Sequence, residues 1–169
     1  ISGYRHGHDV PTQVLVDTGC DMREQLLSAN VTHLDAVLYT HEHADHTHGM
    51  DDLRALSLSN RKRIDVYMAA SARTRIEKAF GYCFTAPPGS DYPPILTAHP
   101  VEAGDRLSID GPGGEIDILA FAQVHGGIRS LGFRVGGLAY SCDISAVPES
   151  ALDALNGLDV WIVDALRPS

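Results

Sequence analysis

Apolar residues along this chain fall into short β-type runs and longer helical repeats. Runs rich in valine, isoleucine and leucine predict strands near residues 13–17, 35–40, 64–69, 94–99, 105–110, 115–122, 131–141 and 159–164. Helical spacing predicts helices near 21–29, 49–59, 70–80 and 147–156. The two types alternate early in the chain, and strands dominate later. This order predicts an α/β fold with two sheets packed face to face and helices outside.

The segment 81–94 interrupts this pattern. It is rich in proline and glycine, which predicts a long loop, and loops of this length often cover or form binding sites. Its aromatic residues Tyr82, Phe84 and Tyr92 could stack on a base or sugar, or they could fix the loop to the body of the protein. The sequence leaves both interpretations open.

Length and composition favour a single domain over residues 1–169. The chain has 169 residues, of which 44% are hydrophobic, enough for one sizeable core. We find no internal repeat, domain linker, transmembrane-length apolar run or signal peptide pattern. The three widely spaced cysteines, Cys20, Cys83 and Cys142, favour reduced thiols and a cytoplasmic location.

The charge balance narrows the expected partners. Lysine plus arginine number 13 and aspartate plus glutamate number 22, which gives a net charge of −9. This acidic balance argues against a broad nucleic-acid-binding face, but a small phosphate-containing substrate remains compatible with it. We expect no membrane partner, and a homodimer is compatible with the chain.

Side chains that can bind a metal are concentrated in one run, His-Glu-His-Ala-Asp-His-Thr-His at 41–48. Imidazoles and carboxylates buried together need partners, and a divalent metal ion supplies them. Alternate residues of an extended segment point the same way, so His41 and His43 can share one ion. Asp45 and His46 follow a turn of the chain and can face a second ion. The alternative is a solvated, histidine-rich surface loop.

This H-x-H-x-D-H pattern resembles the metallo-β-lactamase superfamily, and the resemblance covers about residues 13–166. Val-Leu-Val-Asp-Thr-Gly at 14–19 is similar to the first motif of that superfamily. Asp17 would there orient a ligand histidine, although it could instead cap a helix beginning near Asp21. His125 matches the isolated third histidine, and Asp143 matches the acid that bridges two metals. The implied fold is a four-layer αβ/βα sandwich.

The resemblance implies two divalent ions, zinc or manganese. The first would take His41, His43 and His125, the second Asp45 and His46, and Asp143 would bridge them. The superfamily adds a further histidine after a strand such as 160–164, yet no histidine follows His125. We therefore expect N- and C-terminal pieces of the family's domain to be missing. Asp45 and Asp143 are also the predicted catalytic residues.

Asp-His-Thr-His-Gly at 45–49, the helix after it and the acid at 143 resemble the phosphodiesterase branch of the superfamily, which includes the PhnP-type phosphoribosyl cyclic phosphodiesterases. The implied activity is hydrolysis of a small cyclic or nucleotide-like phosphodiester by a metal-bridging hydroxide. His48 could be a general acid, a support for the ligands or a surface residue. The alternatives are a thioester or lactam hydrolase of the same fold, similar to glyoxalase II or to a β-lactamase, and a non-catalytic metal-binding accessory protein.

Overall fold

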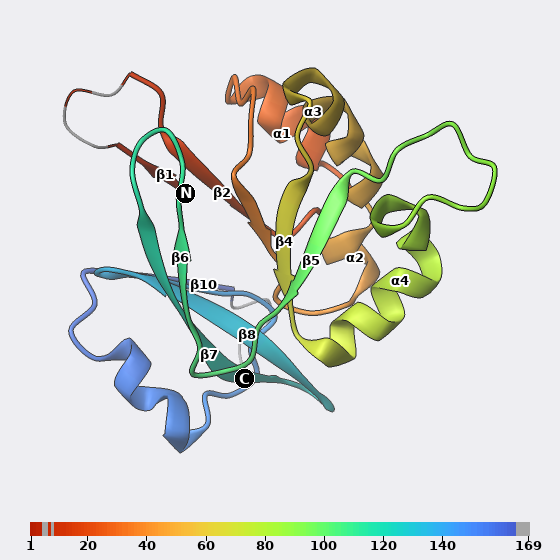
Figure 1. Cartoon of the computed structure of the whole chain (residues 1–169). Helices are drawn as coiled ribbons and strands as arrows, with labels where there is room; N and C mark the ends of the chain where they lie inside the picture. Colours follow the sequence, from red (N-terminus) through yellow and green to blue (C-terminus); the bar gives the residue numbers. More distant parts are fainter. Residues whose placement is uncertain (5–6, 8, 165–169) are drawn as a thin grey trace.

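The strands form two five-stranded sheets in a computed structural model that describes residues 1–4, 7 and 9–164 (Figure 1). In spatial order the first sheet contains β1 (Ser2–Gly3), β2 (Thr12–Val16), β3 (Ala36–Leu38), β4 (Ile64–Met68) and β5 (Leu96–Pro100). Strands β2 to β5 are parallel, and β1 is antiparallel to β2.

The second sheet is mostly antiparallel. Its spatial order is β10 (Val160–Val163), β9 (Leu138–Ser141), β8 (Ile128–Val135), β7 (Ile116–His125) and β6 (Arg106–Ile109). Only the β9–β10 pair is parallel within this sheet.

Helices cover the outer face of the first sheet and part of the second. The helical segments are α1 (Met22–Ser28), α2 (Ala44–Thr47), η1 (Met50–Asp52), α3 (Leu53–Asn60), α4 (Ala70–Phe84) and η2 (Glu149–Leu155), where η denotes a 3-10 helix. One apolar core lies between the first sheet and its helices, a second lies between the sheets, and a third lies under η2. The predicted four-layer α/β sandwich is therefore confirmed.

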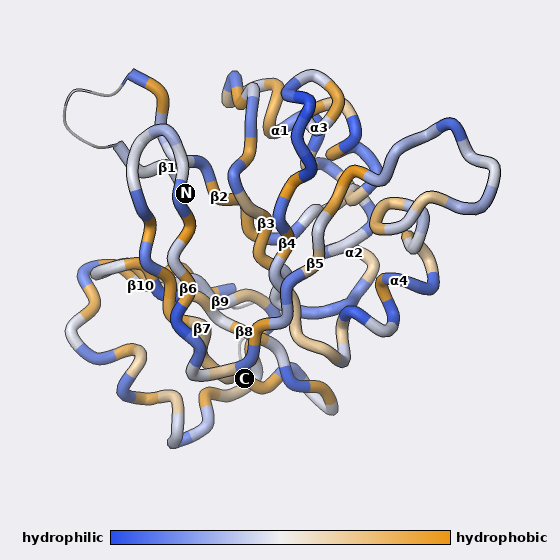
Figure 2. The backbone as a smooth tube through the Cα atoms, viewed as in Figure 1, coloured by the Kyte–Doolittle hydropathy of each residue, from blue (hydrophilic) through white to orange (hydrophobic). Residues whose placement is uncertain are grey.

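Strand β4 illustrates how the sequence pattern produces these layers. Ile64, Val66 and Met68 are buried in the core beneath the helices, and Tyr67 packs against the core between the sheets. Because successive side chains point to opposite faces, an apolar run at the centre of the molecule can serve two cores. In Figure 2 apolar colour is concentrated on the central strands, and hydrophilic colour is frequent on the outer turns.

Four predicted elements differ from the structure. The predicted strand 131–141 is two strands, because a tight turn at Gly136, with φ of +55°, separates β8 from β9. Helix α4 continues past a kink at Phe80 to Phe84, so the predicted loop 81–94 begins only at Thr85. The segment 49–59 is η1 followed by α3, and 147–156 forms a 3-10 helix.

Within the described part of the chain, no helix combines the length and the apolar character that crossing a bilayer requires.

Candidate metal centre

The ligand-rich run 41–48 lies at the C-terminal end of β3, where open α/β sheets usually place their sites. His41 is 1% exposed, and the backbone is still extended at His43 (φ −66°, ψ 154°). Helix α2 then begins and carries Asp45 and His46. This change of backbone explains the order of the ligands in the sequence. The extended part places His41 and His43 on one side, and the helical turn then places Asp45 and His46 beside them.

The second sheet supplies the other two predicted ligands. His125 is the last residue of β7, and Asp143 follows β9. Asp143 has φ of +49° and Asp17, which follows β2, has φ of +58°. A left-handed backbone is uncommon for residues other than glycine and costs of order 1 kcal/mol or more. Both acids therefore occupy unfavourable backbone positions that the surrounding structure holds in place.

One group of potential ligand atoms contains three histidines and the shared acid. His41, His43, His125 and Asp143 each offer an atom within 4.8 Å of the others. His43 Nδ1 lies 3.2 Å from His125 Nε2, and Asp143 Oδ2 lies 3.5 Å from His125 Nε2 and 3.6 Å from His41 Nε2. Tetrahedral zinc ligands at about 2.0–2.2 Å from the ion lie roughly 3.3–3.6 Å from one another. These separations fit one ion.

A second group adjoins the first through Asp143. His46 Nε2 lies 3.2 Å from Asp143 Oδ2 and 3.6 Å from Asp45 Oδ2. The structure thus brings together all six predicted metal ligands in two groups that share Asp143. The assignment of individual residues to individual ions stays a prediction.

The strongest sign that a cation belongs here is an unsatisfied buried atom. His41 Nε2 is buried and has no hydrogen-bond partner, although a buried polar atom without a partner costs about 1–3 kcal/mol. Burial, with a smaller effect from His46, lowers the pKa of His41 to about 4, so its ring is neutral at pH 7. A neutral nitrogen facing the oxygen of Asp143 brings two lone pairs together, and a metal ion between them would satisfy both. The residues present therefore fit a divalent metal.

Asp17 fixes the protons on two of these histidines. His46 Nδ1 donates to Asp17 Oδ2 at 2.8 Å, which leaves Nε2 directed at Asp143. Thr40 Oγ1 donates to the same carboxylate at 2.7 Å and can accept from His41 Nδ1 at 3.0 Å, which leaves His41 Nε2 as an acceptor. One carboxylate thereby directs the Nε2 atoms of two histidines toward the centre. Asp17 takes the orienting role rather than the alternative of capping α1, whose first turn begins after Asp21.

The same contacts affect the basicity of His46. Burial alone would lower its pKa, but the hydrogen bonds to Asp17 and Cys142 outweigh burial and raise the pKa of His46 to about 11. A ligand histidine must lose its metal-facing proton, so metal binding at this nitrogen would release a proton.

Thr40 is a residue of this site that the sequence did not identify, and Cys142, which we expected to be a small packing residue beside Asp143, also belongs to it. Cys142 is 5% exposed, and its Sγ lies 3.4 Å from Thr40 Oγ1 and 3.8 Å from Asp17 Oδ2. It also lies close enough to His41 and His46 to form a third potential ligand group with them. The available signal was adjacency, because Thr40 precedes His41 and Cys142 precedes Asp143 in the sequence.

Close backbone contacts hold α2 against the loop after β2. Thr18 N donates to His46 O at 2.7 Å, and Gly49 N donates to Thr18 O at 2.8 Å. A Cβ added at Gly49 would lie 2.5 Å from Gly19 O, so only glycine permits this approach. The glycine after the histidine run therefore has a packing role that places Asp17 beside His46.

Other polar residues near the run have partners of their own. The ring of exposed His48 packs edge-on against Phe80, with centroids 5.8 Å apart. Glu42, largely buried, points to Arg75 with a separation of 3.6 Å.

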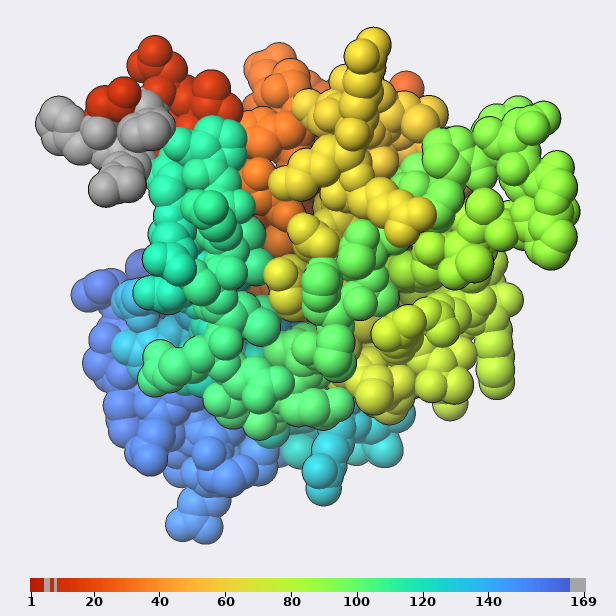
Figure 3. Space-filling view, viewed as in Figure 1, coloured from red at the N-terminus to blue at the C-terminus, as the bar shows by residue number. Residues whose placement is uncertain are grey.

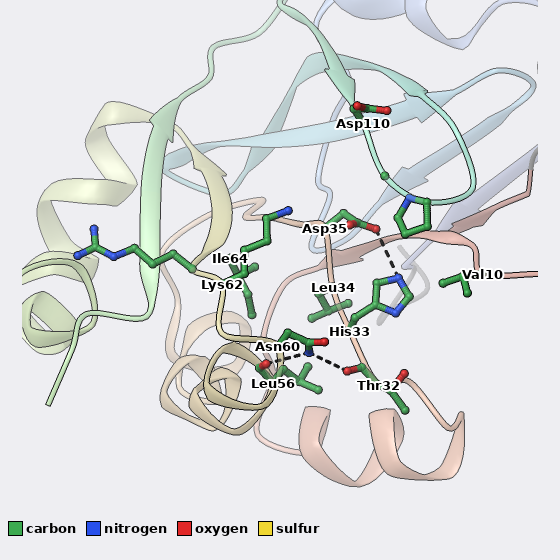
Figure 4. Close-up of a pocket in the computed structure, with 13 residues that line it drawn as sticks. Val10, Thr32, His33, Leu34, Asp35, Leu56, Asn60, Lys62, Ile64 and Asp110 are labelled. Carbon is green, nitrogen blue, oxygen red and sulfur yellow. Dashed lines mark hydrogen bonds and ion pairs between the residues drawn. The ribbon is translucent and has the colours of Figure 1, made fainter.

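A cavity of about 610 Å³ lies at the other end of the parallel strands, away from the metal ligands (Figure 4). It contains a further histidine–acid pair, with His33 Nε2 3.6 Å from Asp35 Oδ2. His33 Nε2 also pairs with Pro11 O at 3.0 Å, and Asp35 Oδ2 accepts from Gln13 N at 2.9 Å. Both of these side chains thus have protein partners.

Comparisons with known proteins agree with this geometry. A family model described as beta-lactamase superfamily domain matches residues 12–169. A solved structure described as a new diphosphatase from the PhnP family is 30% identical, with a TM-score of 0.74, and the match covers 88% of this chain and 54% of that one. The MIM-2 metallo-beta-lactamase, at 20% identity, TM-score 0.56 and coverage of 89% and 64%, shares the fold.

A curated relative carries a different description. The octanoyltransferase of Porphyromonas gingivalis (strain ATCC BAA-308 / W83) is 28% identical over 161 residues, which is 94% of this chain and 31% of that protein. The chain thus spans about half the length of the diphosphatase and about a third of the octanoyltransferase.

Proposed function

The chain belongs to the beta-lactamase superfamily, and we propose that it is a metal-dependent phosphodiesterase acting on a small cyclic or nucleotide-like phosphodiester. The observation that carries the proposal is the cluster around buried His41 Nε2, where six histidine and aspartate side chains converge at ligand spacing. The resemblance to the PhnP-family diphosphatase supports phosphorus chemistry.

His41, His43, His125, Asp45, His46 and Asp143 would hold two divalent ions, zinc or manganese. Such ions act as Lewis acids that polarise a phosphoryl group and lower the pKa of water. The side chains of the protein position the ligand atoms. Asp17 and Thr40 orient the rings of His46 and His41 so that Nε2 of each faces the centre, and Asp143 is shared by the two ligand groups.

Asp45 is the acid best placed to meet substrate. Its side chain is 76% exposed, whereas Asp143 is 23% exposed and lies deeper between the histidines. In hydrolysis the water oxygen bonds to phosphorus, the ester P–O bond breaks, and the leaving oxygen takes a proton. Asp45 or Asp143 would accept the proton that the attacking water loses.

A second candidate is hydrolysis of a diphosphate linkage. The observation that favours it is the 30% identity to a protein described as a diphosphatase, over 88% of this chain. The same ligand cluster could serve either reaction, because both break a P–O bond of a phosphoryl group that is esterified or anhydride-linked.

The test is a substrate panel with the purified chain loaded with manganese or zinc. Bis(p-nitrophenyl) phosphate, a cyclic nucleotide, a nucleoside diphosphate, a thioester and a chromogenic β-lactam should be compared by kcat/KM. We expect the diesters to be cleaved best, and His43→Ala to abolish cleavage. Faster turnover of the diphosphate would favour the second candidate. Efficient thioester or lactam hydrolysis with no cleavage of the diesters or the diphosphate would refute both.

A further inference from the structure

The aromatic residues of the proline-rich segment 81–94 have two different environments. Phe84 packs against the core beneath the helices and anchors the segment. Tyr82 and Tyr92 are 42% and 74% exposed. Phe84 therefore fixes the end of α4 against the body of the protein, and the rings of Tyr82 on α4 and Tyr92 in the loop remain available to a ligand.

An arginine side chain that is paired with an aspartate lies beside one of the exposed rings. The guanidinium of Arg54 on α3 lies over the ring of Tyr82, 5.9 Å from its centroid, and donates to Asp51 Oδ1 at 2.9 Å. Cys83 Sγ also donates to Asp51 Oδ1, at 3.6 Å. These contacts connect η1, α3 and the end of α4, so Tyr82 has fixed neighbours although it is exposed.

Arg54, Tyr82, Pro87, Ser90 and Tyr92 line a cavity of about 280 Å³, which we call the tyrosine pocket. It lies where the loop after α4 projects from the body of the molecule, visible as the green lobe in Figure 3. Small-molecule sites begin at roughly 300 Å³, so this volume suits one ring system rather than a whole nucleotide.

The tyrosine pocket lies along the helices that lead away from the metal centre. His48 ends α2 and packs against Phe80, which is two residues before Tyr82 on α4. Arg54 follows His46 by eight residues, across the end of α2, η1 and the start of α3, so a short stretch of chain connects the pocket with the metal centre. We expect an extended nucleotide substrate bound in the pocket to reach the metal centre through its sugar and phosphate linker.

We propose that the tyrosine pocket binds the base of a nucleotide substrate whose phosphoryl group is hydrolysed at the metal centre. Two tyrosine rings, a proline ring and an arginine face offer stacking and cation–π surface, which every base can use. Stacking on a ring does not distinguish one base from another, so we expect weak discrimination among bases. The identification of the ligand as a substrate rests on the proposed function, whereas the binding itself does not.

Binding should first be measured with a probe that carries no phosphate. Titration of the metal-loaded chain with adenosine, followed by calorimetry or ligand-observed NMR, should show binding, and ribose alone should not bind. Loss of a stacked ring costs about 1–3 kcal/mol, so Tyr82→Leu and Tyr92→Leu should each weaken adenosine binding at least fivefold. Tyr82→Phe keeps the ring and should bind adenosine nearly as well as the parent chain.

Kinetics then connect the pocket to the reaction. The ratio of kcat/KM for thymidine 5′-(p-nitrophenyl phosphate) to that for methyl p-nitrophenyl phosphate should fall at least fivefold in Tyr92→Leu. Tyr4→Leu removes a tyrosine that is 67% exposed elsewhere and should leave the ratio unchanged. Adenosine binding without hydrolysis of either diester would uphold the pocket and refute the proposed function. No adenosine binding, or equal binding in the leucine variants, would overturn the pocket.

Discussion

The two ends of the parallel sheet each place a histidine beside an aspartate, but only one end presents free ligand atoms. At the N-terminal ends of the strands, His33 and Asp35 are satisfied by Pro11 O and Gln13 N. At the C-terminal ends, His41 Nε2 is buried without a partner and faces Asp143. The end that holds the cavity of about 610 Å³ is therefore not the end that holds the potential metal ligands.

The difference shows what distinguishes a metal site from a polar cavity. At the metal end, Thr40 and Asp17 hydrogen-bond to Nδ1 of His41 and His46, respectively, and Nε2 of each ring faces the shared acid Asp143. At the cavity end, His33 Nε2 and Asp35 Oδ2 each already have a backbone partner. Unsatisfied atoms held at ligand spacing are thus more informative than cavity volume.

Loss of the shared acid should have the largest effect. Asp143→Ala removes the oxygen common to both ligand groups, so we expect loss of at least one bound ion and a decrease in kcat/KM of about a thousandfold or more. Elemental analysis and diester kinetics would measure both. Asp110→Ala, which removes an exposed acid of the opposite cavity, should change neither quantity. Normal metal content in Asp143→Ala would contradict the two-group arrangement.

Removing metal should destabilise the parent chain. An ion present at about 100 times its dissociation constant stabilises the native state by about 2.7 kcal/mol, which corresponds to roughly 5–10 °C in Tm for a chain of this size. Chelation followed by thermal denaturation should show this decrease, and restoring zinc or manganese should reverse it. Identical melting curves with and without chelator would indicate that no ion occupies the cluster.

Weakening the orienting network should have an intermediate effect. Asp17→Asn and Thr40→Val disturb the hydrogen bonds that set His46 and His41, so we expect metal affinity to fall about 10–100-fold. Competition with a metal-sensitive dye would measure it. Asp35→Asn is the matched change at the cavity end and should leave affinity at the parent value. An equal effect in Asp35→Asn would mean that the loss reflects general destabilisation.

Changing the histidine of the cavity end should have the smallest effect. His33→Gln loses one hydrogen bond to Pro11 O, so the free energy of unfolding should decrease by about 1 kcal/mol or less. Metal content and diester hydrolysis should match those of the parent chain. A large loss of activity in this variant would show that the two ends of the sheet are coupled.

Much of the fold was predictable because it depends on local pattern. The runs at 13–17, 35–40 and 64–69 predicted β2, β3 and β4 nearly to the residue, since apolar β-branched runs have few other uses in a buried sheet. The division of 131–141 into β8 and β9 was missed because the apolar run continues on both sides of Gly136. The extension of α4 to Phe84 was missed because Gly81 suggested a helix end that the packing of Cys83 and Phe84 overrides.

The sequence by itself determined the identity of the donors and their local order, because an extended segment followed by a helical turn orients His41, His43, Asp45 and His46 whatever surrounds them. Tertiary structure alone decided which distant groups meet them. His125 lies 82 residues from His43, and Asp143 lies 97 residues from His46. These pairs meet because an apolar core packs the two sheets face to face, and that core also brings Thr40 and Cys142 against Asp17.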